Sequence, residues 1–350
     1  MSHLQLDYIA LDTLDSWIRS LELGPQARRI LGMTVFGSPE GLGGKLPNSL
    51  SERQWPRMAL PVLGHDTPAW VEVWSVPASA APLEQGEVCG VSYTRCADLV
   101  FAWLTTSLPS ADHQLAPTTQ ETYDALFSAL GQLACPHPWR FWNYMPDILG
   151  AHQGEERYRI FNVGRHASFR SHSGLIEQHP PAACALGHPK GMAAPLSVYA
   201  LASSRPAQSI ENPRQLSAYH YPPQYGPRSP SFSRAALAPV GGEETVFISG
   251  TASIVGHDTV HLNDVKAQTE ETLNNIEALL ARFAVERPAK GWQMADLHLK
   301  AYVTHSSDLP TVREVVQRRL GPLMPCVYLQ AVVCRPDLLV EIEASAIRSR

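Results

Sequence analysis

The chain lacks three features that would place it at once: a long apolar run, an excess of positive charge and paired cysteines. No stretch of 18 apolar residues occurs among the 350, so no segment is expected to span a membrane. The formal net charge of −5 argues against a nucleic-acid binder, because such proteins carry a basic face. The six cysteines are scattered without a CxxC pair, as is typical of free thiols in a reducing compartment.

The N-terminal segment mixes aspartates with apolar residues and lacks the basic start and apolar centre of a signal peptide. With the free thiols, this predicts a cytoplasmic protein. Apolar residues make up 44% of the chain and charged residues 17%, as in soluble globular proteins. A chain of 350 residues is long enough for two domains with separate cores.

The chain has 29 prolines, and they cluster in segments such as 179–195 ("HPPAACALGHPKGMAAP") and 219–234 ("YHYPPQYGPRSPSFSR"). Both are expected to be long ordered loops. Loops of this length in a compact protein often line a binding site, so both segments are candidates for that role.

The second half of the chain alternates strand and helix patterns. Residues 244–254 read as a strand that ends in a glycine turn, and a second strand falls within 292–310. The segment 263–283 has apolar residues at helical spacing, and Asn263 or Asp264 is its expected N-cap. A helix at 311–320 and a closing hairpin follow. The order predicts an α+β fold with helices packed on one face of a mixed sheet.

The first half repeats this order in outline. Residues 98–107 resemble the first strand of the second half, 120–133 resemble its helix, and 138–148 take the place of its next strand. We therefore predict an internal duplication with two such mixed-sheet domains, at 1–180 and 181–350. The boundary is expected within the Pro-rich stretch 178–240.

Two segments combine arginines with aromatic residues: 156–170 ("ERYRIFNVGRHASFR") and 219–234. An arginine binds a carboxylate through two parallel hydrogen bonds, and aromatic side chains suit the walls around a flat ring. Together the segments suit a small, ring-shaped dianion, although each arginine taken singly could equally have a structural role.

Two histidines stand four residues apart in the segment "HDTVH", with an aspartate next to the first. The segment is expected in a loop and lacks the glutamate of the HExxH motif, so surface histidines are the preferred interpretation. The alternative is a metal-dependent oxygenase of aromatic or pterin substrates, with His257, Asp258 and His261 as ligands.

The C-terminal segment 328–345 ("YLQAVVCRPDLLVEIEAS") is predicted to form a hairpin of two apolar strands. With a two- or four-residue turn, Cys334 lies opposite Leu339. Side chains alternate along a strand, so Cys334 and Glu341 would share a face as diagonal neighbours, with Glu343 on the same face. A three-residue turn would separate the thiol from the carboxyl, and an exposed face would leave both glutamates merely solvated.

Several of these stretches resemble the chorismatase family, whose members convert chorismate into hydroxybenzoates or a dihydroxycyclohexadiene carboxylate. The resemblance covers about 60% of the chain, from residue 139 to the C-terminus, and rests on "RFWNYMPDI", "ERYRIFNVGRHASF", "SAYHYPPQYGPRSPSFSRA", "VFISGTAS" and "CRPDLLVEIEA". More distantly, "FISGTASI" and "VEIEASA" resemble the small trimeric imine deaminases of the YjgF type. Those deaminases hold a carboxylate with an arginine near the start of the penultimate strand. Cys326 stands there, which argues against imine deamination.

The resemblance implies that Glu341 is the acid that protonates the enolpyruvyl group. It also implies that a cysteine at the place of Cys334 accompanies aromatic products, whereas members with alanine there resemble simple hydrolases. The expected products are therefore 3-hydroxybenzoate and pyruvate, with 4-hydroxybenzoate as a possible companion, and no cofactor or metal is expected. Gly250, within "VFISGTAS", is expected among the substrate-binding residues.

A glutamate with its ordinary pKa of about 4.3 would be ionised at neutral pH and could not donate a proton. Burial would raise that pKa, so an interior position would make Glu341 an acid. Arg165 and Arg234 are candidates for the two carboxylates of chorismate, and Tyr221 and Tyr225 for hydrogen-bonding walls. A non-catalytic ligand binder is a further alternative. A monomer is preferred, because a duplicated scaffold could complete a trimer-like arrangement within few chains, and a trimer stays open.

Overall fold

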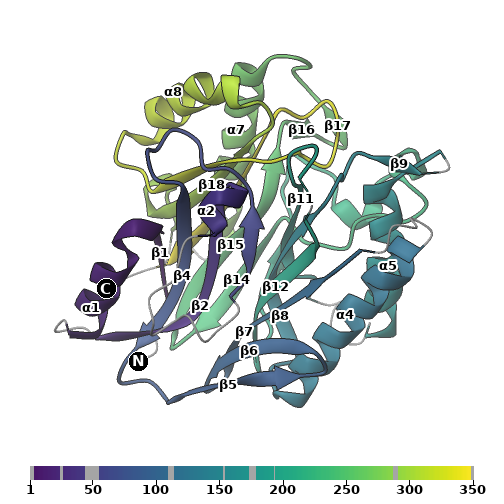
Figure 1. The fold of residues 1–350 in the computed structure, drawn as a ribbon. Helices are drawn as coiled ribbons and strands as arrows, with labels where there is room; N and C mark the ends of the chain where they lie inside the picture. The colour runs from purple at the N-terminus through teal and green to yellow at the C-terminus, as the bar shows by residue number, and fades with distance from the viewer. Residues whose placement is uncertain are drawn as a thin grey trace.

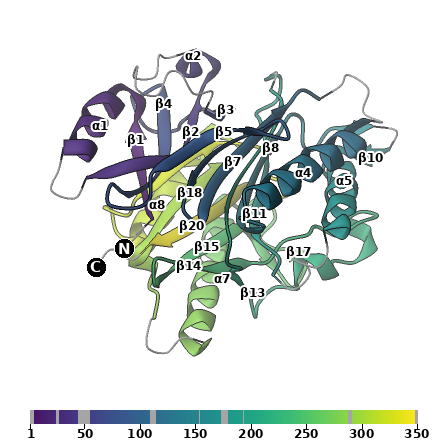
Figure 2. The same ribbon diagram turned by 90° about the horizontal axis from the view of Figure 1, so that it is seen from below.

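One four-stranded and two six-stranded sheets face a common centre, and the helices lie around the outside (Figure 1, Figure 2). This computed structural model describes residues 4–23, 27–43, 55–108, 114–152, 154–172, 179–192, 194–286 and 291–347. None of the described helices is both long and apolar enough to cross a membrane. The strand pairing divides the chain into three successive units.

The middle unit has eight principal elements in the order β5, β6, β7, α4, β8, α5, β11 and β12. Their bounds are Leu83–Val88, Val91–Cys96, Leu99–Thr106, Leu115–Gln132, His137–Met145, Arg157–Ser171, Ala182–Gly187 and Leu196–Ser203. Its sheet has the spatial order β11-β8-β12-β7-β6-β5. The strands β8 and β11 run parallel, and the other neighbours are antiparallel.

The C-terminal unit repeats this plan with β13, β14, β15, α7, β18, α8, β19 and β20. Their bounds are Gln208–Ile210, Ala235–Val240, Glu243–Ala252, Val265–Glu286, Leu297–Val303, Leu309–Leu320, Cys326–Gln330 and Val340–Ile347. Its sheet has the order β13-β14-β15-β20-β18-β19, the same succession as in the middle unit. The predicted α+β class and internal duplication are therefore confirmed.

The N-terminal unit is a shortened third version, which the sequence analysis missed. It consists of β1 (Gln5–Ala10), α1 (Leu14–Leu23), β2 (Arg28–Gly37), α2 (Pro39–Leu42), β3 (Arg57–Ala59) and β4 (Ala69–Pro77). Its order β1-β4-β2-β3 matches the order of the four later strands in each of the other units, β7-β12-β8-β11 and β15-β20-β18-β19. The two remaining strand pairs are short: β9 (Ala151–His152) with β10 (Glu155–Glu156), and β16 (Ile254–Val255) with β17 (Asp258–Thr259).

Strand pairing places the division between the two complete units later than residue 180. The segment 179–195, expected to be a loop, contains β11, which pairs with β8 of the middle sheet, and β12 then pairs with β7. We therefore propose a boundary at residues 204–207, between β12 and β13. This position lies inside the Pro-rich stretch expected to contain the boundary, whose first residue, Gln178, is outside the described part of the chain.

The expected C-terminal hairpin is wrong. Strand β19 pairs in parallel with β18, and β18 lies between β19 and β20. Residues 331–339 cross from one strand to the other, and within them Val332 forms an isolated bridge with Gly187 of the middle unit. Two apolar strands joined by a short polar segment read as a hairpin, but nine residues are also enough to cross one neighbouring strand. Cys326 does begin the penultimate strand.

The helices bury their apolar faces against the outer faces of the sheets. Helix α7 carries a buried stripe that includes Leu273, Ile276, Leu279 and Phe283, packed on the outer face of the C-terminal sheet. Asp264 caps this helix as predicted, since its Oδ1 accepts a hydrogen bond from Ala267 N–H at 2.9 Å. The apolar spacing thus fixes which side of the sheet the helix covers, and the other side is left to face the centre.

The inner faces of the three sheets meet in one shared core. At its centre the hydroxyls of Tyr144 and Tyr302 are 2.7 Å apart, and the ring of Phe36 lies 6.0 Å from that of Tyr144. These three residues come from β8, β18 and β2, one from each unit. The three units therefore surround a common axis within one chain.

We expect the Leu279→Ala substitution to lower the free energy of unfolding by about 2–5 kcal/mol, because Leu279 is fully buried between α7 and its sheet. Urea-induced unfolding would measure this. Val285→Ala on the same helix is the control, since Val285 is 72% exposed and its loss should change little. Equal effects of the two substitutions would contradict the placement of this helix.

Candidate active site

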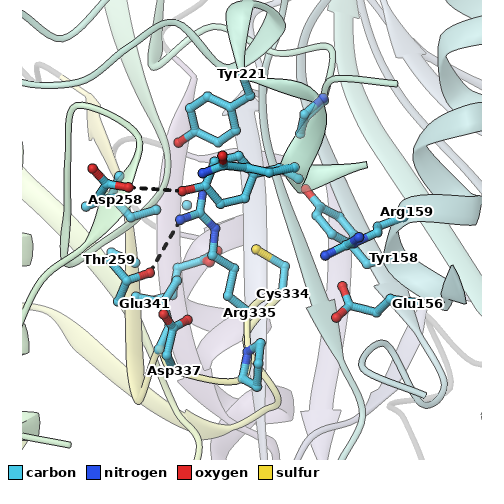
Figure 3. Close-up of a pocket in the computed structure, with 18 of the residues that line it drawn as sticks. Glu156, Tyr158, Arg159, Tyr221, Asp258, Thr259, Cys334, Arg335, Asp337 and Glu341 are labelled. Atoms are coloured by element: carbon cyan, nitrogen blue, oxygen red, sulfur yellow. Dashed lines mark hydrogen bonds between the residues drawn. The ribbon is translucent and has the colours of Figure 1, made fainter. Parts of the chain in front are cut away.

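A pocket of about 480 Å³ lies where the middle and C-terminal units meet (Figure 3). Helix α5 supplies one wall through its first turn. The opposite walls come from the 221–234 segment, from β15 and from the residues that follow β19. The wall residues on which the site depends are Tyr158, Tyr221, Arg234, Gly250, Cys334 and Glu341.

A smaller recess of about 40 Å³ continues inward from the pocket. Arg165 of α5 and Cys184 of β11 line only this recess, whereas Gly250, Cys334 and Glu341 line both spaces. Glu341 therefore stands at the border between a wide outer chamber and a narrow inner one.

The structure brings all seven sequence-predicted site residues to this place. They are Glu341, Cys334, Arg165, Tyr221, Tyr225, Arg234 and Gly250. The argument that joined Cys334 to Glu341 was wrong, because it assumed the hairpin register. The thiol instead reaches the pocket from the crossing segment after β19, and Figure 3 shows it near Glu341.

Glu341 is a buried carboxyl group with 4% exposure, and its Oε1 has no hydrogen-bond partner among the described residues. Burial is the main cause that raises its pKa from the ordinary 4.5 to about 8, and the charge of Glu343 adds to it. Arg140 and Arg234 act in the opposite direction without cancelling the rise. At neutral pH this side chain therefore carries a proton that it can donate.

Glu343 lies two residues further along the same face of β20 and has the opposite protonation state. Burial disfavours its charge, but Lys300 and Arg140 outweigh burial and lower its pKa to about 2. Its Oε1 is 2.8 Å from Lys300 Nζ, and its Oε2 is 2.6 Å from Arg140 Nη2. One strand thus presents a protonated and an ionised carboxyl side by side.

Gly250 makes room for the Glu341 side chain. The β15–β20 register shifts between Ile248 and Thr251, and Gly250 lies within this irregularity. A Cβ atom at position 250 would collide with Oε1 of Glu341 and would lie 3.1 Å from Cβ of Cys184. The absence of a side chain here leaves the carboxyl group facing the pocket.

The thiol of Cys334 is protonated in this environment. Burial, followed by the neighbouring Glu341, raises the pKa of Cys334 to about 12. Burial likewise raises the pKa of Cys184, in the recess, well above its usual value. Neither thiol is therefore a thiolate nucleophile near neutral pH. Cys334 contributes an apolar, weakly donating surface beside the acid.

Arg165 is a nearly fully buried cation that forms no ion pair with any described residue. Its exposure is 1%, and its Nε and Nη2 have no hydrogen-bond partner among the described residues. The guanidinium lies over the rings of Phe169 and Tyr123, at 5.0 and 5.5 Å from their centroids. Because an unpaired buried charge is costly, this cation is suited to an anionic group in the recess.

Arg234 holds the outer chamber together. Its Nη2 donates hydrogen bonds to the carbonyl of Leu216 at 2.6 Å and to the hydroxyl of Tyr221 at 2.8 Å. Its Nε is buried and has no partner among the described residues, so it is left to bind a ligand.

Sequence reasoning missed Arg335 and Tyr158, both of which line the pocket. The guanidinium of Arg335 lies 4.1 Å from the ring centroid of Tyr225, and its Nη1 donates to the carbonyl of His257 at 2.9 Å. Its Nη2 is buried without a partner among the described residues. A signal was present, because Arg335 directly follows Cys334.

The three proposed metal ligands, His257, Asp258 and His261, do not point toward a common centre. His257 Nδ1 is 3.1 Å from Asp258 Oδ1, whereas His261 Nε2 is 3.6 Å from Glu271 Oε2. In the described part of the chain, no group of three His, Cys, Asp or Glu side chains has the arrangement of a metal site. The oxygenase alternative therefore loses its ligand set.

The raised pKa of Glu341 predicts a pH-dependent stability. The folded protein holds a proton there up to pH about 8, whereas the unfolded chain releases it near pH 4.5. Stability is therefore lost between these values as pH rises, by up to about 1.4 kcal/mol per pH unit. Urea unfolding from pH 5 to 8 should show this slope for the natural chain relative to Glu341→Gln. Parallel curves would contradict it.

Comparisons with known proteins show the family of the chain. The family profile described as "Chorismatase FkbO/Hyg5-like, N-terminal" matches residues 72–202. A chorismatase from Streptomyces rapamycinicus is 36% identical over 316 residues, covering 89% of this chain and 92% of that protein. A 3-hydroxybenzoate synthase from Streptomyces hygroscopicus is 33% identical over 336 residues, covering 93% and 94%. A solved chorismatase structure superimposes with a TM-score of 0.81 at 31% identity, covering 99% of both chains. The chain therefore belongs to the chorismatase family.

Proposed function

We propose that this protein converts chorismate into 3-hydroxybenzoate and pyruvate, with Glu341 as the acid that begins the reaction. The observation that carries the proposal is a buried, protonated carboxyl group that faces a pocket lined by unpaired arginine nitrogens. Relatives that match nine-tenths of the chain are named chorismatase and 3-hydroxybenzoate synthase, which supports the same activity.

The chemistry requires an acid at carbon. The enolpyruvyl group of chorismate is an enol ether, and a proton delivered to its methylene carbon produces an oxocarbenium ion. The neighbouring ring hydroxyl can capture this cation and close a cyclic ketal. The bond between that oxygen and its ring carbon then breaks, loss of the proton from the ring carbon of the ether makes the ring aromatic, and the remaining hemiketal releases pyruvate. Chorismate contains the same atoms as the two products together, so the conversion consumes no water and requires no oxidant. The ring proton restores the acid form of the enzyme.

The two carboxylates of chorismate match two cationic positions. We assign one to Arg165 in the recess and the other to Arg234 in the outer chamber, where Arg335 provides a further free nitrogen. Tyr221 and Tyr225 form an aromatic wall of the outer chamber, with ring centroids 5.3 Å apart. Bidentate arginine contacts would hold the enolpyruvyl group beside Glu341, the border residue of both spaces.

Cys334 directs the outcome after protonation. Its protonated thiol occupies the position beside Glu341 from which a water molecule would otherwise attack the cation. Exclusion of water favours capture by the ring hydroxyl and so the aromatic product, with 4-hydroxybenzoate as a possible minor product of the same cation.

We further propose that the enzyme acts in the cytoplasm as a monomer on this small-molecule substrate. All six cysteines are free thiols, which suits a reducing compartment. Three units already surround the central axis within one chain, so the arrangement needs no second copy.

Glu341→Gln should reduce pyruvate release from chorismate by at least about a hundredfold, because an amide cannot donate this proton. The measurement is pyruvate formation with a coupled assay, in the presence and absence of a chelator. Glu87→Gln, on an exposed strand away from the pocket, is the control and should keep full activity. Full activity of Glu341→Gln would refute the acid role. Chorismate binding without product in the natural chain would favour the ligand-binder alternative.

Cys334→Ala should change the product ratio and leave pyruvate release within about tenfold, because the smaller side chain admits water beside the cation. Chromatography of the products should show less 3-hydroxybenzoate and more of the hydrolysed cyclohexadiene. Cys326→Ala is the matched control, since Cys326 is half-buried and lines neither the pocket nor the recess. An unchanged ratio for Cys334→Ala would refute the directing role.

A further inference from the structure

A group of four buried charged side chains lies behind the pocket and takes no part in lining it. We call it the central ion cluster, and it consists of Glu72, Arg140, Lys300 and Glu343. We infer that this cluster is a positioning device that holds Glu341 in its acid form, and that it brings the N-terminal unit into the chemistry. The inference rests on the proposed function, in which Glu341 is the proton donor.

The cluster is built from all three units. Lys300 of β18 lies between two carboxylates, 2.5 Å from Glu72 Oε2 and 2.8 Å from Glu343 Oε1. Arg140 of β8 approaches Glu343 Oε2 at 2.6 Å and donates to the carbonyl of Ile248 at 3.1 Å. All four side chains are at most 4% exposed as residues. Trp142 Nε1 donates a further hydrogen bond to Glu343 at 2.8 Å.

The charges of the cluster balance. Two carboxylates and two cations sum to zero, so the cluster has no cation to spare for a third carboxylate. Ionisation of Glu341 would place an uncompensated negative charge in a dry site, two residues from the ionised Glu343 on the same strand face. Glu341 therefore keeps its proton while Glu343 stays charged.

Among the other titratable groups that face Glu341, Arg234 favours its ionised form, but less strongly than burial and Glu343 oppose that form. These groups are Tyr158 and Arg165 on α5, Cys184 on β11, Arg234 at the start of β14, and Cys334 after β19. Burial keeps Tyr158 and both thiols neutral. The two arginines are the proposed partners of the substrate carboxylates, so in the complex their charges are matched by the ligand.

Glu72 makes the inference testable at a distance. It belongs to β4 of the N-terminal unit and lines neither the pocket nor the recess. Its Oε1 accepts a hydrogen bond from Trp74 Nε1 at 2.8 Å, and its Oε2 faces Lys300. Loss of this remote charge would leave the cluster with a net positive charge, which favours the ionised form of Glu341.

The test is the pH dependence of kcat for chorismate in the natural chain and three variants, each checked for folding by circular dichroism. In the natural chain kcat should fall as pH rises past about 8, where Glu341 loses its proton. Glu343→Gln and Glu72→Gln each give the cluster a charge of +1. Both should move this fall to lower pH, the first by about 1–3 pH units.

The double variant Glu343→Gln/Lys300→Met restores a neutral cluster. The pH at which its kcat falls should therefore return toward that of the natural chain. A folded Glu343→Gln variant whose kcat falls at the same pH as that of the natural chain would overturn the inference. If Glu343→Gln does not fold, Glu72→Gln decides alone. A kcat of Glu72→Gln that falls at the same pH as in the natural chain would then overturn the inference as well. An active Glu341→Gln would instead defeat the proposed function. If Glu341→Gln is inactive but the pH dependence of kcat is unchanged in Glu343→Gln and Glu72→Gln, only the inference is refuted.

Discussion

The proposed acid role of Glu341 depends on one interaction, the pair of ion contacts that Lys300 and Arg140 make with Glu343. A carboxylate this deeply buried is tolerable only with cations against both of its oxygens, and the two ion pairs of 2.8 and 2.6 Å supply them. Glu341, two residues away on the same strand, has no such partner among the described residues and faces the pocket. One strand therefore carries two carboxyl groups with opposite protonation states, which is a recurrent way to obtain an acid at neutral pH.

The repeated units show why the chain has one such acid. At equivalent positions of the three sheets, Trp70 pairs with Phe36, Ser197 with Tyr144, and Glu341 with Tyr302. The three facing residues meet at the central axis, so the comparison is like for like. Only the C-terminal unit has an acid at this position. Where the N-terminal and C-terminal units meet, Arg313 lies against Gly64 and donates to its carbonyl at 3.0 Å.

Much of the fold could be predicted from local patterns. The apolar stripe of α7 and the repeated order of strands and helices are sequence-local, and the structure confirms both. The N-terminal unit was not predicted from the sequence because it lacks the first two strands of the repeat. The crossing of residues 331–339 was not predicted because it depends on a bridge between Val332 and Gly187, which are distant in sequence. The site residues came from the family resemblance and from Arg–aromatic clustering, whereas the ion cluster joins residues up to 271 positions apart (Glu72 to Glu343) and has no local signature.

The central claim is that Glu341 is protonated in the folded enzyme at neutral pH, and infrared spectroscopy tests it directly. A protonated carboxyl has a carbonyl band that an ionised one lacks, and subtraction of the Glu341→Gln spectrum isolates that of Glu341. The account predicts that this band persists at pH 7 and disappears around pH 8. Absence of the band at pH 6 in the folded protein would contradict the account.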